Sequence, residues 1–291
     1  MYYLGIDGGG SVTRAVVTDE HCRVLARYDA GSINYRAIGL ASARVNLQSL
    51  TAQIHVPLRG CMIGNAALSG PAPEEELHAL TDGILTARRL AMDSDLSIAL
   101  EAMQSPGPCA VAIAGTGSMA AGRAGEGEVV LHTGGWGWLL GDEGSGFDIA
   151  SQAIRAALRA YEGSGPATAL TGELCAFFGA DTPAQLLGLF YNPPKAPNQI
   201  AAFAARVLVC CDDISREIVR RCAAEFAETV RALLLQLPAD TALGLWGGMF
   251  QHSEFYRAAF CQALGRQAEL LPVPPEEGAA RAAVRNEGGP P

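Results

Sequence analysis

The apolar and polar positions at the start of the chain form short runs separated by tight turns. Three such runs open the sequence, at residues 2–7, 13–18 and 23–28. A glycine turn at 8–10 and a polar turn at 19–21 join them. Short apolar runs joined by tight turns are typical of strands, so we expect an antiparallel meander here.

Helical spacing of apolar positions appears after the meander. The pattern predicts a helix over 35–54, then a strand over 61–68 and a helix over 73–90. Acidic residues in the first turn of this second helix favour its N-terminus. A weak short strand is expected near Ala91 and Met92. The predicted order of elements is therefore βββαβα.

A second unit of the same kind begins at residue 109. It has an apolar strand at 109–114, a glycine-rich turn at 115–118 and further strands at 119–122 and 128–132. Asp7 and its glycine turn align with Ala114 and the turn that follows it. Such an internal repeat predicts two related halves that face each other.

The remainder of the chain reads as mostly helical. Helices are expected at 146–161, 201–209, 213–237 and 253–264, with a strand at 242–246. A last short helix follows the prolines at 272–275, and the tail at 288–291 is expected to fray. We predict an N-terminal domain at 1–105, a C-terminal domain at 106–274, and a C-terminal helix and tail at 275–291.

Composition and charge exclude several classes of protein. Of 291 residues, 49% are hydrophobic and 18% are charged, which is incompatible with global disorder. A net charge of −9 without a run of Lys or Arg makes the chain a poor partner for nucleic acids or anionic membranes. No apolar stretch approaches the ~18 residues of a membrane span. The N-terminus has no basic segment before Asp7, so we expect no signal peptide and a cytoplasmic protein.

The eight cysteines form no CxxC pair, and only Cys210 and Cys211 are close together in the sequence. Cysteines spaced in this way usually behave as small buried hydrophobic residues in a reducing compartment. We therefore expect structural cysteines rather than a metal or redox site.

Two glycine turns suggest sites for phosphate. The turn at 8–10 lies between strands, which excludes the dinucleotide fingerprint and the Walker A loop because both need a following helix. Backbone N–H groups in such a turn can still surround an anion. Asp7 beside the turn then suggests Mg²⁺, which prefers one or two carboxylates together with phosphate and water. The turn at 115–118 adds two hydroxyl groups, although either turn could also be an ordinary hairpin.

The densest signal lies at 134–146, where six glycines, two tryptophans and two acids occur in thirteen residues. Glycines allow close backbone approach, and the acids can accept hydrogen bonds from the hydroxyls of a polar ligand. Gly144 or Ser145 could begin the helix that follows, with its N–H groups directed at the ligand. The alternative is a packed turn with tryptophan in the core.

These stretches carry a resemblance to a known family. Residues 5–11, 114–118, 134–145 and 244–248 resemble the phosphate-1, phosphate-2, sugar-loop and adenosine motifs of N-acetylglucosamine kinases. These kinases belong with the BadF/BadG/BcrA/BcrD ATPase family of the sugar kinase/actin/heat-shock-protein superfamily. The resemblance covers nearly the whole chain in the right order. It implies an α/β fold of two ribonuclease-H-like (actin-like ATPase) domains with a nucleotide cleft between them.

The same resemblance assigns residues to ATP and Mg²⁺. Asp7 would act on Mg²⁺, directly or through water, and Gly247 and Gly248 would face the adenosine. The residues expected around the phosphates are Gly9, Gly10, Ser11, Thr13, Thr116 and Gly117.

For the acceptor, the resemblance identifies Asp95 as the catalytic aspartate and Asn34 as a sugar-binding residue. Four further residues of the sugar loop are expected in the same pocket: Gly135, Trp136, Asp142 and Glu143. Asp95 could instead cap the helix that follows it, a role that Asp93 or Ser94 could equally fill. His132 is expected to be a strand residue.

The chain departs from the family pattern at two places. Leu96 follows Asp95 where a small residue is commoner, and Asn65 replaces the leucine of a Gly-Leu-Ala segment. Neither change removes a group that the chemistry needs.

The expected function is transfer of the γ-phosphoryl group of ATP to the C6 hydroxyl of N-acetylglucosamine, a small-molecule sugar substrate. Glucosamine and N-acetylmuramic acid are alternative acceptors. Another alternative is an ATPase activator of a 2-hydroxyacyl-CoA dehydratase, which needs cysteines for a shared iron–sulfur cluster. A nucleotide-driven switch such as an actin-like module is a third. The resemblance alone also implies a homodimer.

Overall fold

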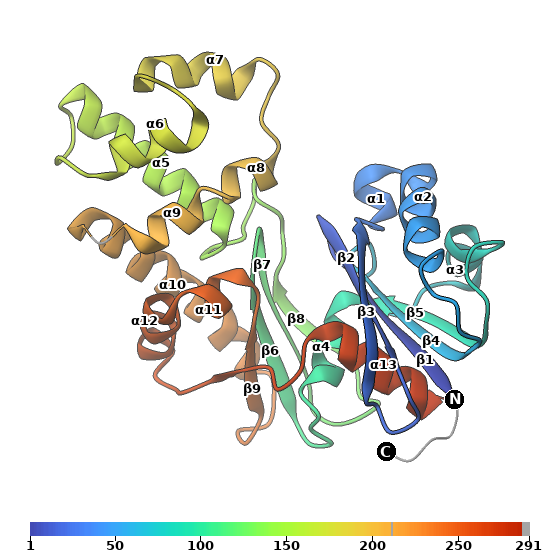
Figure 1. The fold of residues 1–291 in the computed structure, drawn as a ribbon. Coiled ribbons are helices and arrows are strands. Elements are labelled where there is room, and N and C mark those ends of the chain that lie inside the picture. Colours follow the sequence, from blue (N-terminus) through green and yellow to red (C-terminus); the bar gives the residue numbers. More distant parts are fainter. Residues whose placement is uncertain (211, 287–291) are drawn as a thin grey trace. The chain divides into compact units, whose positions relative to one another are not determined.

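The computed structural model describes residues 1–210 and 212–286, and the chain forms two compact units. Unit 1 contains Met1–Val111, Gly125–Val130 and the described residues from Leu271 onward, whereas unit 2 contains Ala112–Ala124 and Leu131–Leu270 (Figure 1). The final helix thus belongs with the N-terminal unit. Our expectations about Cys211 and about the tail at 288–291 lie outside the described residues.

Unit 1 is built on a five-stranded sheet with the order β3-β2-β1-β4-β5. Its strands are β1 (Tyr2–Gly8), β2 (Val12–Thr18), β3 (Val24–Gly31), β4 (Leu58–Asn65) and β5 (Ala87–Ser94). The first three pair antiparallel, as the short runs and turns predict, and β1, β4 and β5 are parallel.

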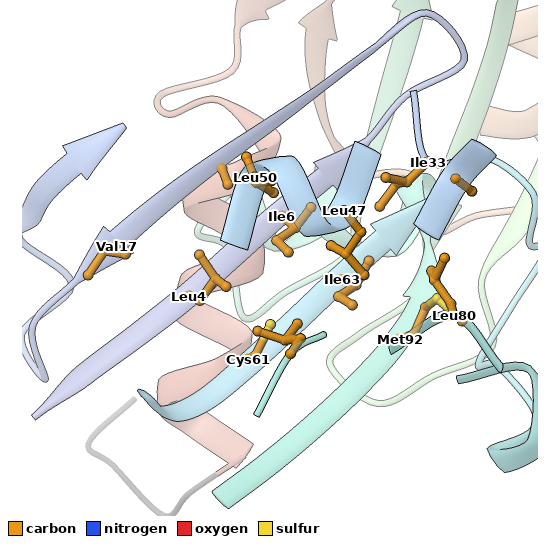
Figure 2. Close-up of a cluster of buried hydrophobic side chains, with 13 residues drawn as sticks. Leu4, Ile6, Val17, Ile33, Leu47, Leu50, Cys61, Ile63, Leu80 and Met92 are labelled. Carbon is orange, nitrogen blue, oxygen red and sulfur yellow. The ribbon is translucent and has the colours of Figure 1, made fainter. Parts of the chain in front are cut away.

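Helices cover both faces of this sheet. They are α1 (Tyr35–Ile38), α2 (Leu40–Thr51), α3 (Glu74–Thr81), α4 (Asp95–Ala102) and α13 (Pro275–Asn286). On one face, Leu4 and Ile6 of β1 pack in a buried cluster with Leu47 of α2 and Leu80 of α3 (Figure 2). On the other face, Tyr3 packs in a cluster with residues of α4 and α13. Because side chains alternate along a strand, the central parallel strands β1 and β4 are buried on both faces, whereas the edge strand β5 is only partly buried.

Two of the predicted helices are wrong in their extent. The one expected over 35–54 is two helices, because Gly39 adopts a positive φ of 81° that interrupts the helical backbone. The one expected over 73–90 ends at Thr81, followed by Gly83 with a φ of 74°. Residues beyond it form β5, an eight-residue strand paired in parallel with β4. The weak strand expected near Met92 is therefore confirmed and is longer than the local pattern indicates.

Unit 2 also carries a five-stranded sheet, with the order β10-β9-β6-β7-β8. Its strands are β6 (Cys109–Ala114), β7 (Ser118–Arg123), β8 (Leu131–Gly134), β9 (Ala242–Trp246) and β10 (Glu269–Leu270). The chain passes from unit 1 to unit 2 within β6. His132 lies in β8, as expected.

Helices make up most of unit 2. They are α5 (Gly146–Glu162), α6 (Leu170–Phe178), the 3₁₀ helix η1 (Pro183–Gln185), α7 (Leu186–Tyr191), α8 (Pro197–Ala201), α9 (Ala204–Val209), α10 (Asp213–Leu234), α11 (Gly248–His252) and α12 (Glu254–Leu264). Phe226 of α10 stacks with Phe250 and Phe260 in the core. The region between α5 and α9 folds into short helices that the sequence pattern did not predict. None of the described helices is both long and apolar enough to cross a membrane.

Candidate functional site

In unit 1, the candidate residues gather at the carboxyl edge of the parallel strands. Asp7 at the end of β1 pairs with Gly64 of β4, which in turn pairs with Asp93 of β5. Parallel strands end at one edge of a sheet, so the segments that follow them are neighbours. Ligands of open α/β sheets bind at this edge.

Asp7 lies on the same face of the sheet as Tyr3 and Gly5, because alternate residues share a face. This is the face that α4 and α13 cover. A Cβ added to Gly64 would lie 2.3 Å from the side chain of Ile98, so α4 packs directly on the end of β4. Asp95, at the start of α4, is thereby brought to the same edge as Asp7.

Asp95 is the first residue of α4 but does not cap it. The side-chain oxygen of Ser94 accepts a hydrogen bond from the Ser97 backbone N–H at 3.2 Å and caps the helix. Asp93 accepts from the Ser94 N–H at 2.6 Å. The capping role is therefore filled by Ser94, which leaves the Asp95 carboxyl available for other chemistry.

Both aspartates have perturbed acidity. Burial is the main reason why the pKa of Asp7 rises to about 7, and the charges of Asp95 and Glu276 raise it further, against an opposing effect of Arg14. Burial also raises the pKa of Asp95 to about 6, although backbone N–H groups at Leu96 and Asp95 act in the other direction. Two desolvated carboxyl groups that repel each other form a natural site for a cation.

The glycine hairpin between β1 and β2 leaves room beside these carboxyl groups. A Cβ on Gly10 would meet nothing within 4 Å, and one on Gly9 would meet only the Val12 carbonyl oxygen, at 3.0 Å. Thr13 is fully buried, and its hydroxyl has no hydrogen-bond partner among the described residues. Ser11 is exposed. The hairpin thus presents backbone and a buried hydroxyl at the edge where Asp7 lies.

Amide side chains hold the segment that carries Asn34. Asn34 itself caps α1, because its side-chain oxygen accepts from the Ala37 N–H at 3.1 Å. Asn65 donates to the Ile33 carbonyl oxygen at 3.1 Å, and Asn46 donates to the Ser32 carbonyl oxygen at 2.7 Å. Sequence reasoning missed this role of Asn65, although the departure from Gly-Leu-Ala at this position was its signal.

The Ser32 hydroxyl completes the connection by donating to the Gly9 carbonyl oxygen at 2.9 Å. The segment that carries Asn34 and the glycine hairpin therefore form one hydrogen-bonded group in unit 1.

In unit 2, the turn at 115–118 contacts the glycine-rich loop at 134–145. A Cβ on Gly117 would lie 2.6 Å from a carboxylate oxygen of Asp142. The Ser118 hydroxyl donates to the Glu143 carbonyl oxygen at 2.7 Å, and the Gly135 N–H donates to the Ser118 carbonyl oxygen at 3.1 Å. Thr116 and Gly117 are thereby brought next to the acids of the loop.

Asp142 is held by the backbone. It is buried and has a positive φ of 63°, a conformation uncommon for residues other than glycine. Burial raises the pKa of its carboxyl, and the Glu143 charge adds to this. Hydrogen bonds from the backbone N–H groups of Ser118 and Gly137 oppose the rise. The Glu143 side chain, in contrast, is exposed.

The start of α5 fixes the end of the loop. Ser145 caps the helix by accepting from the Asp148 N–H at 3.1 Å, and the Gly144 N–H donates to Asp148 at 2.9 Å. The buried Tyr256 hydroxyl donates to the Gly144 carbonyl oxygen at 2.7 Å. The sequence therefore identified the start of this helix correctly, whereas the support from Tyr256 is visible only in the structure.

The tryptophans of the loop are not core residues. Trp136 is 71% exposed and Trp138 is 45% exposed, with the ring of Trp138 at 5.1 Å from that of Phe147. The alternative of a packed turn with tryptophan in the core is wrong for Trp136. Its indole is available to a ligand.

The glycine pair after β9 lies beside the same turn. Gly247 has a φ of 99°, and a Cβ there would lie 2.3 Å from the Ala114 carbonyl oxygen. The Gly146 N–H donates to the Gly115 carbonyl oxygen at 2.8 Å. Unit 2 thus gathers the turn at 115–118, the start of α5 and the pair Gly247–Gly248 into one group of backbone segments. Among the described residues, no three His, Cys, Asp or Glu side chains form a metal cage.

The sequence model of one protein family matches almost the whole chain. The BadF/BadG/BcrA/BcrD ATPase family model matches residues 4–284. The chain belongs to this ATPase family. The resemblance that the glycine motifs indicate is thereby confirmed.

Two curated relatives resemble this chain over most of its length. The N-acetylmuramic acid/N-acetylglucosamine kinase of Clostridium acetobutylicum is 28% identical over 80% of this chain and 79% of the relative. The N-acetyl-D-glucosamine kinase of Dictyostelium discoideum is 27% identical over 82% of this chain and 81% of the relative.

A solved structure shows the fold. A Porphyromonas gingivalis protein described as a candidate N-acetylglucosamine kinase superposes with a TM-score of 0.77 at 21% identity, covering 98% of this chain and 99% of the other. With the two five-stranded sheets, this likeness confirms the predicted α/β fold class.

Proposed function

We propose that this protein is an ATP-dependent amino-sugar kinase that transfers the γ-phosphoryl group of ATP to the C6 hydroxyl of N-acetylglucosamine. The observation that carries the proposal is the state of Asp95. Its carboxyl lies at the edge of the unit 1 sheet where the parallel strands end. Ser94, and not Asp95, caps α4, and burial raises the pKa of Asp95 to about 6.

Asp95 acts as the general base. A pKa of about 6 leaves the carboxyl largely ionised at neutral pH but more basic than an exposed aspartate. It therefore accepts the proton of the sugar hydroxyl as that oxygen attacks the γ-phosphoryl group. A base positioned in this way contributes roughly 10²–10⁴-fold to the rate.

The residues around Asp7 fit a magnesium ion. Carboxylate oxygens are the protein ligands that Mg²⁺ prefers, usually one or two alongside phosphate and water. The raised pKa of Asp7 reflects repulsion from neighbouring acids as well as burial, and a cation would relieve that repulsion. When bound, the ion neutralises charge on the phosphates. Asp7 holds it, directly or through water.

Backbone groups bind the nucleotide in this proposal. Gly9, Gly10 and Ser11 with the buried Thr13 surround phosphate in unit 1, and Thr116 and Gly117 do so in unit 2. Gly247 and Gly248 face the adenosine. Gly247 packs its backbone closely against the end of β6, because a Cβ there would clash with the Ala114 carbonyl oxygen, and this packing fixes the position of the glycine pair.

Asn34, Gly135, Trp136, Asp142 and Glu143 bind the sugar. The amide, the two carboxylates and the exposed indole offer hydrogen-bond partners and an apolar face. The two curated relatives are named for N-acetylglucosamine, and one also for N-acetylmuramic acid, which supports an N-acetylated amino sugar as the acceptor.

The first experiment is a coupled assay of ADP release. The acceptors are N-acetylglucosamine, glucosamine, N-acetylmannosamine, N-acetylmuramic acid and glucose. We expect the strongest response with N-acetylglucosamine, its loss in Asp95→Asn, and slow ATP hydrolysis without sugar because water is excluded from the reacting groups. A stronger response to glucosamine or N-acetylmuramic acid would replace the acceptor but keep the reaction. Equal ADP release with and without every sugar would overturn the kinase proposal.

An ATPase activator of a 2-hydroxyacyl-CoA dehydratase is the second candidate. It requires an iron–sulfur cluster, so visible absorption of anaerobically purified protein would favour it. Cys61 and Cys109 are buried, and burial raises the pKa of the Cys61 thiol, both of which fit structural cysteines. We also propose that the protein is cytoplasmic and forms a homodimer. Light scattering of the purified protein tests the homodimer by its mass.

A further inference from the structure

The last described helix lies unusually close to the strand that carries Asp7. A Cβ on Gly5 of β1 would lie 2.1 Å from the Glu276 carbonyl oxygen, and one on Gly60 of β4 would lie 2.9 Å from the Ala283 carbonyl oxygen. Gly60 pairs with Tyr3, two residues before Gly5. The N-terminus of α13 is therefore directed toward the end of β1 at which Asp7 lies.

Glu276 stands in the first turn of α13, on the path to Asp7. Asp7 is two residues beyond Gly5 on the same face, a step of roughly 7 Å along a strand. Side chains of a helix lean toward its N-terminus. The carboxylate of Glu276 accepts from Arg27, which lies across the sheet at the register of Gly5, and its charge acts on Asp7.

The Glu276 carboxylate is buried and only half partnered. Its side chain is 6% exposed, and one oxygen accepts from Arg27 at 3.3 Å. The other oxygen, Oε2, is buried without a hydrogen-bond partner among the described residues. A buried acid with an unpartnered oxygen reduces stability, so its presence calls for an explanation other than packing.

The surrounding charges leave an excess of negative charge near Asp7. The charges of Glu276 and Asp95 raise the pKa of Asp7. The charge of Arg14 lowers the pKa of both Asp7 and Glu276. Glu277, the next residue of α13, pairs with Arg27 as well but is not among the charges that act on Asp7. Burial is the main reason why the pKa of Glu276 is raised.

We propose that Glu276 is a positioning residue for the divalent cation of the kinase site, in which its carboxylate, held by α13 and Arg27, adds negative potential at Asp7 and strengthens cation binding there. This inference rests on the proposed function, because it concerns the ion assigned to Asp7. Glu276 does not ligate the ion, which agrees with the lack of a three-carboxylate cage among the described residues.

The test is direct measurement of Mn²⁺ binding by titration of the free-ion electron paramagnetic resonance signal, with saturating ADP and no sugar. The variants are Glu276→Gln, Glu276→Asp, the matched control Glu277→Gln, Arg14→Gln and Asp7→Asn. Circular dichroism and thermal melting confirm that each variant is folded.

We expect Glu276→Gln to weaken Mn²⁺ binding about five- to tenfold, since one charge at this range acts through a partly screened interior. Glu276→Asp keeps the charge and should retain most of the affinity, and Glu277→Gln should match the wild type. Arg14→Gln should tighten binding, because it removes a positive charge that acts on both acids.

The outcomes separate this inference from the proposed function. Wild-type affinity in Glu276→Gln, or an equal loss in Glu277→Gln, would overturn the role of Glu276 alone. If Asp7→Asn also binds Mn²⁺ as the wild type does, the ion is not at Asp7 and both assignments fail. Sugar-dependent ADP release then shows independently whether the kinase activity itself stands. If Glu276→Gln does not fold, Glu276→Asp decides, and Mn²⁺ binding as weak as that of Asp7→Asn would overturn the proposal, because the charge is still present.

Discussion

The two units present similar strand–turn–strand motifs but opposite chemistry. In unit 1, Asp7 precedes the glycine turn, and burial and neighbouring acids raise its pKa to about 7. In unit 2, Ala114 stands at the equivalent position, and the nearby Asp142 accepts hydrogen bonds from the backbone N–H groups of Ser118 and Gly137. Unit 1 therefore holds carboxylates that repel one another, whereas backbone hydrogen bonds partly compensate the charge of the acid in unit 2.

This difference teaches where each kind of substitution should act. A poorly compensated carboxylate stores unfavourable electrostatic energy that a cation or a proton can release. A surface made of backbone groups has no such unfavourable electrostatic energy, but it depends on glycine conformations that few other residues adopt. Charge changes should therefore affect unit 1 most, and steric changes should affect unit 2 most.

The largest expected effect is on catalysis in unit 1. Asp95→Asn should lower kcat by about 10²–10⁴-fold while the protein stays folded, because the amide cannot accept the hydroxyl proton. Asp142→Asn in unit 2 should change the KM for the sugar more than kcat. Steady-state kinetics of both variants measure this contrast, and an equal loss of kcat in the two would erase it.

The pH dependence of the wild type belongs to the same prediction. The base must be ionised, so log kcat/KM should fall as pH drops through about 6, the pKa of Asp95. A flat profile between pH 5 and 8 would contradict the assignment.

The next effect concerns stability. Because Asp7 binds its proton more tightly in the folded protein than in the unfolded chain, its contribution to stability falls as pH rises from 3.8 to about 7. Asp7→Asn should therefore raise the free energy of unfolding at pH 8 by about 2–4 kcal/mol, with a smaller gain at pH 5. Urea unfolding at the two pH values checks this. Asp142→Asn should give a smaller gain, because two backbone hydrogen bonds offset part of the cost of burying its charge.

Replacement of a glycine by alanine should lower stability more in unit 2 than in unit 1. Gly247→Ala must relieve a Cβ at 2.3 Å from a backbone oxygen and a φ of 99°, so we expect a loss of about 1–3 kcal/mol and a raised KM for ATP. Gly10→Ala in the unit 1 turn meets open space and should stay within about 0.5 kcal/mol of the wild type. Thermal melts that rank the two glycines the other way would contradict this account.

The smallest expected effects are alike in the two units. Ser94 and Ser145 each cap the helix that begins at the candidate site, with N–H to hydroxyl distances of 3.2 and 3.1 Å. Replacement of either serine by alanine should cost about 1 kcal/mol. Denaturant midpoints measure both, and a difference of several kcal/mol between them would show that one serine does more than cap.

The fold could be predicted well where local patterns and chain contacts agree. The meander of unit 1 follows from its apolar runs and tight turns, and the serine cap of α5 follows from the glycine-rich loop before it. The pattern failed at 73–90, because β5 is an edge strand in which the adjacent Arg88 and Arg89 are both exposed, so its residues do not alternate between apolar and polar. Only its pairing with β4 identifies β5.

The candidate site was predictable in part for the same reason. Glycine turns, Asp7 and the loop at 134–145 are local signals. The choice between Asp95 as base and Asp95 as cap depends on which neighbouring oxygen reaches the Ser97 N–H, and the structure assigns that hydrogen bond to Ser94. Tyr256 carried no signal of a supporting role, and Asn65 carried only its departure from Gly-Leu-Ala, since the partners of both lie far away in the sequence.

By itself, the sequence determined the family, the α/β class and the positions of the turns, because each follows from short stretches whose residue types restrict the backbone. The tertiary structure alone decided which charges meet. Asp7, Asp95 and Glu276 are separated by 88 and 181 residues, yet β1, α4 and α13 bring them to interacting distance in unit 1. Electrostatic interaction depends on distance and burial in space, and neither is written in the order of residues along a chain.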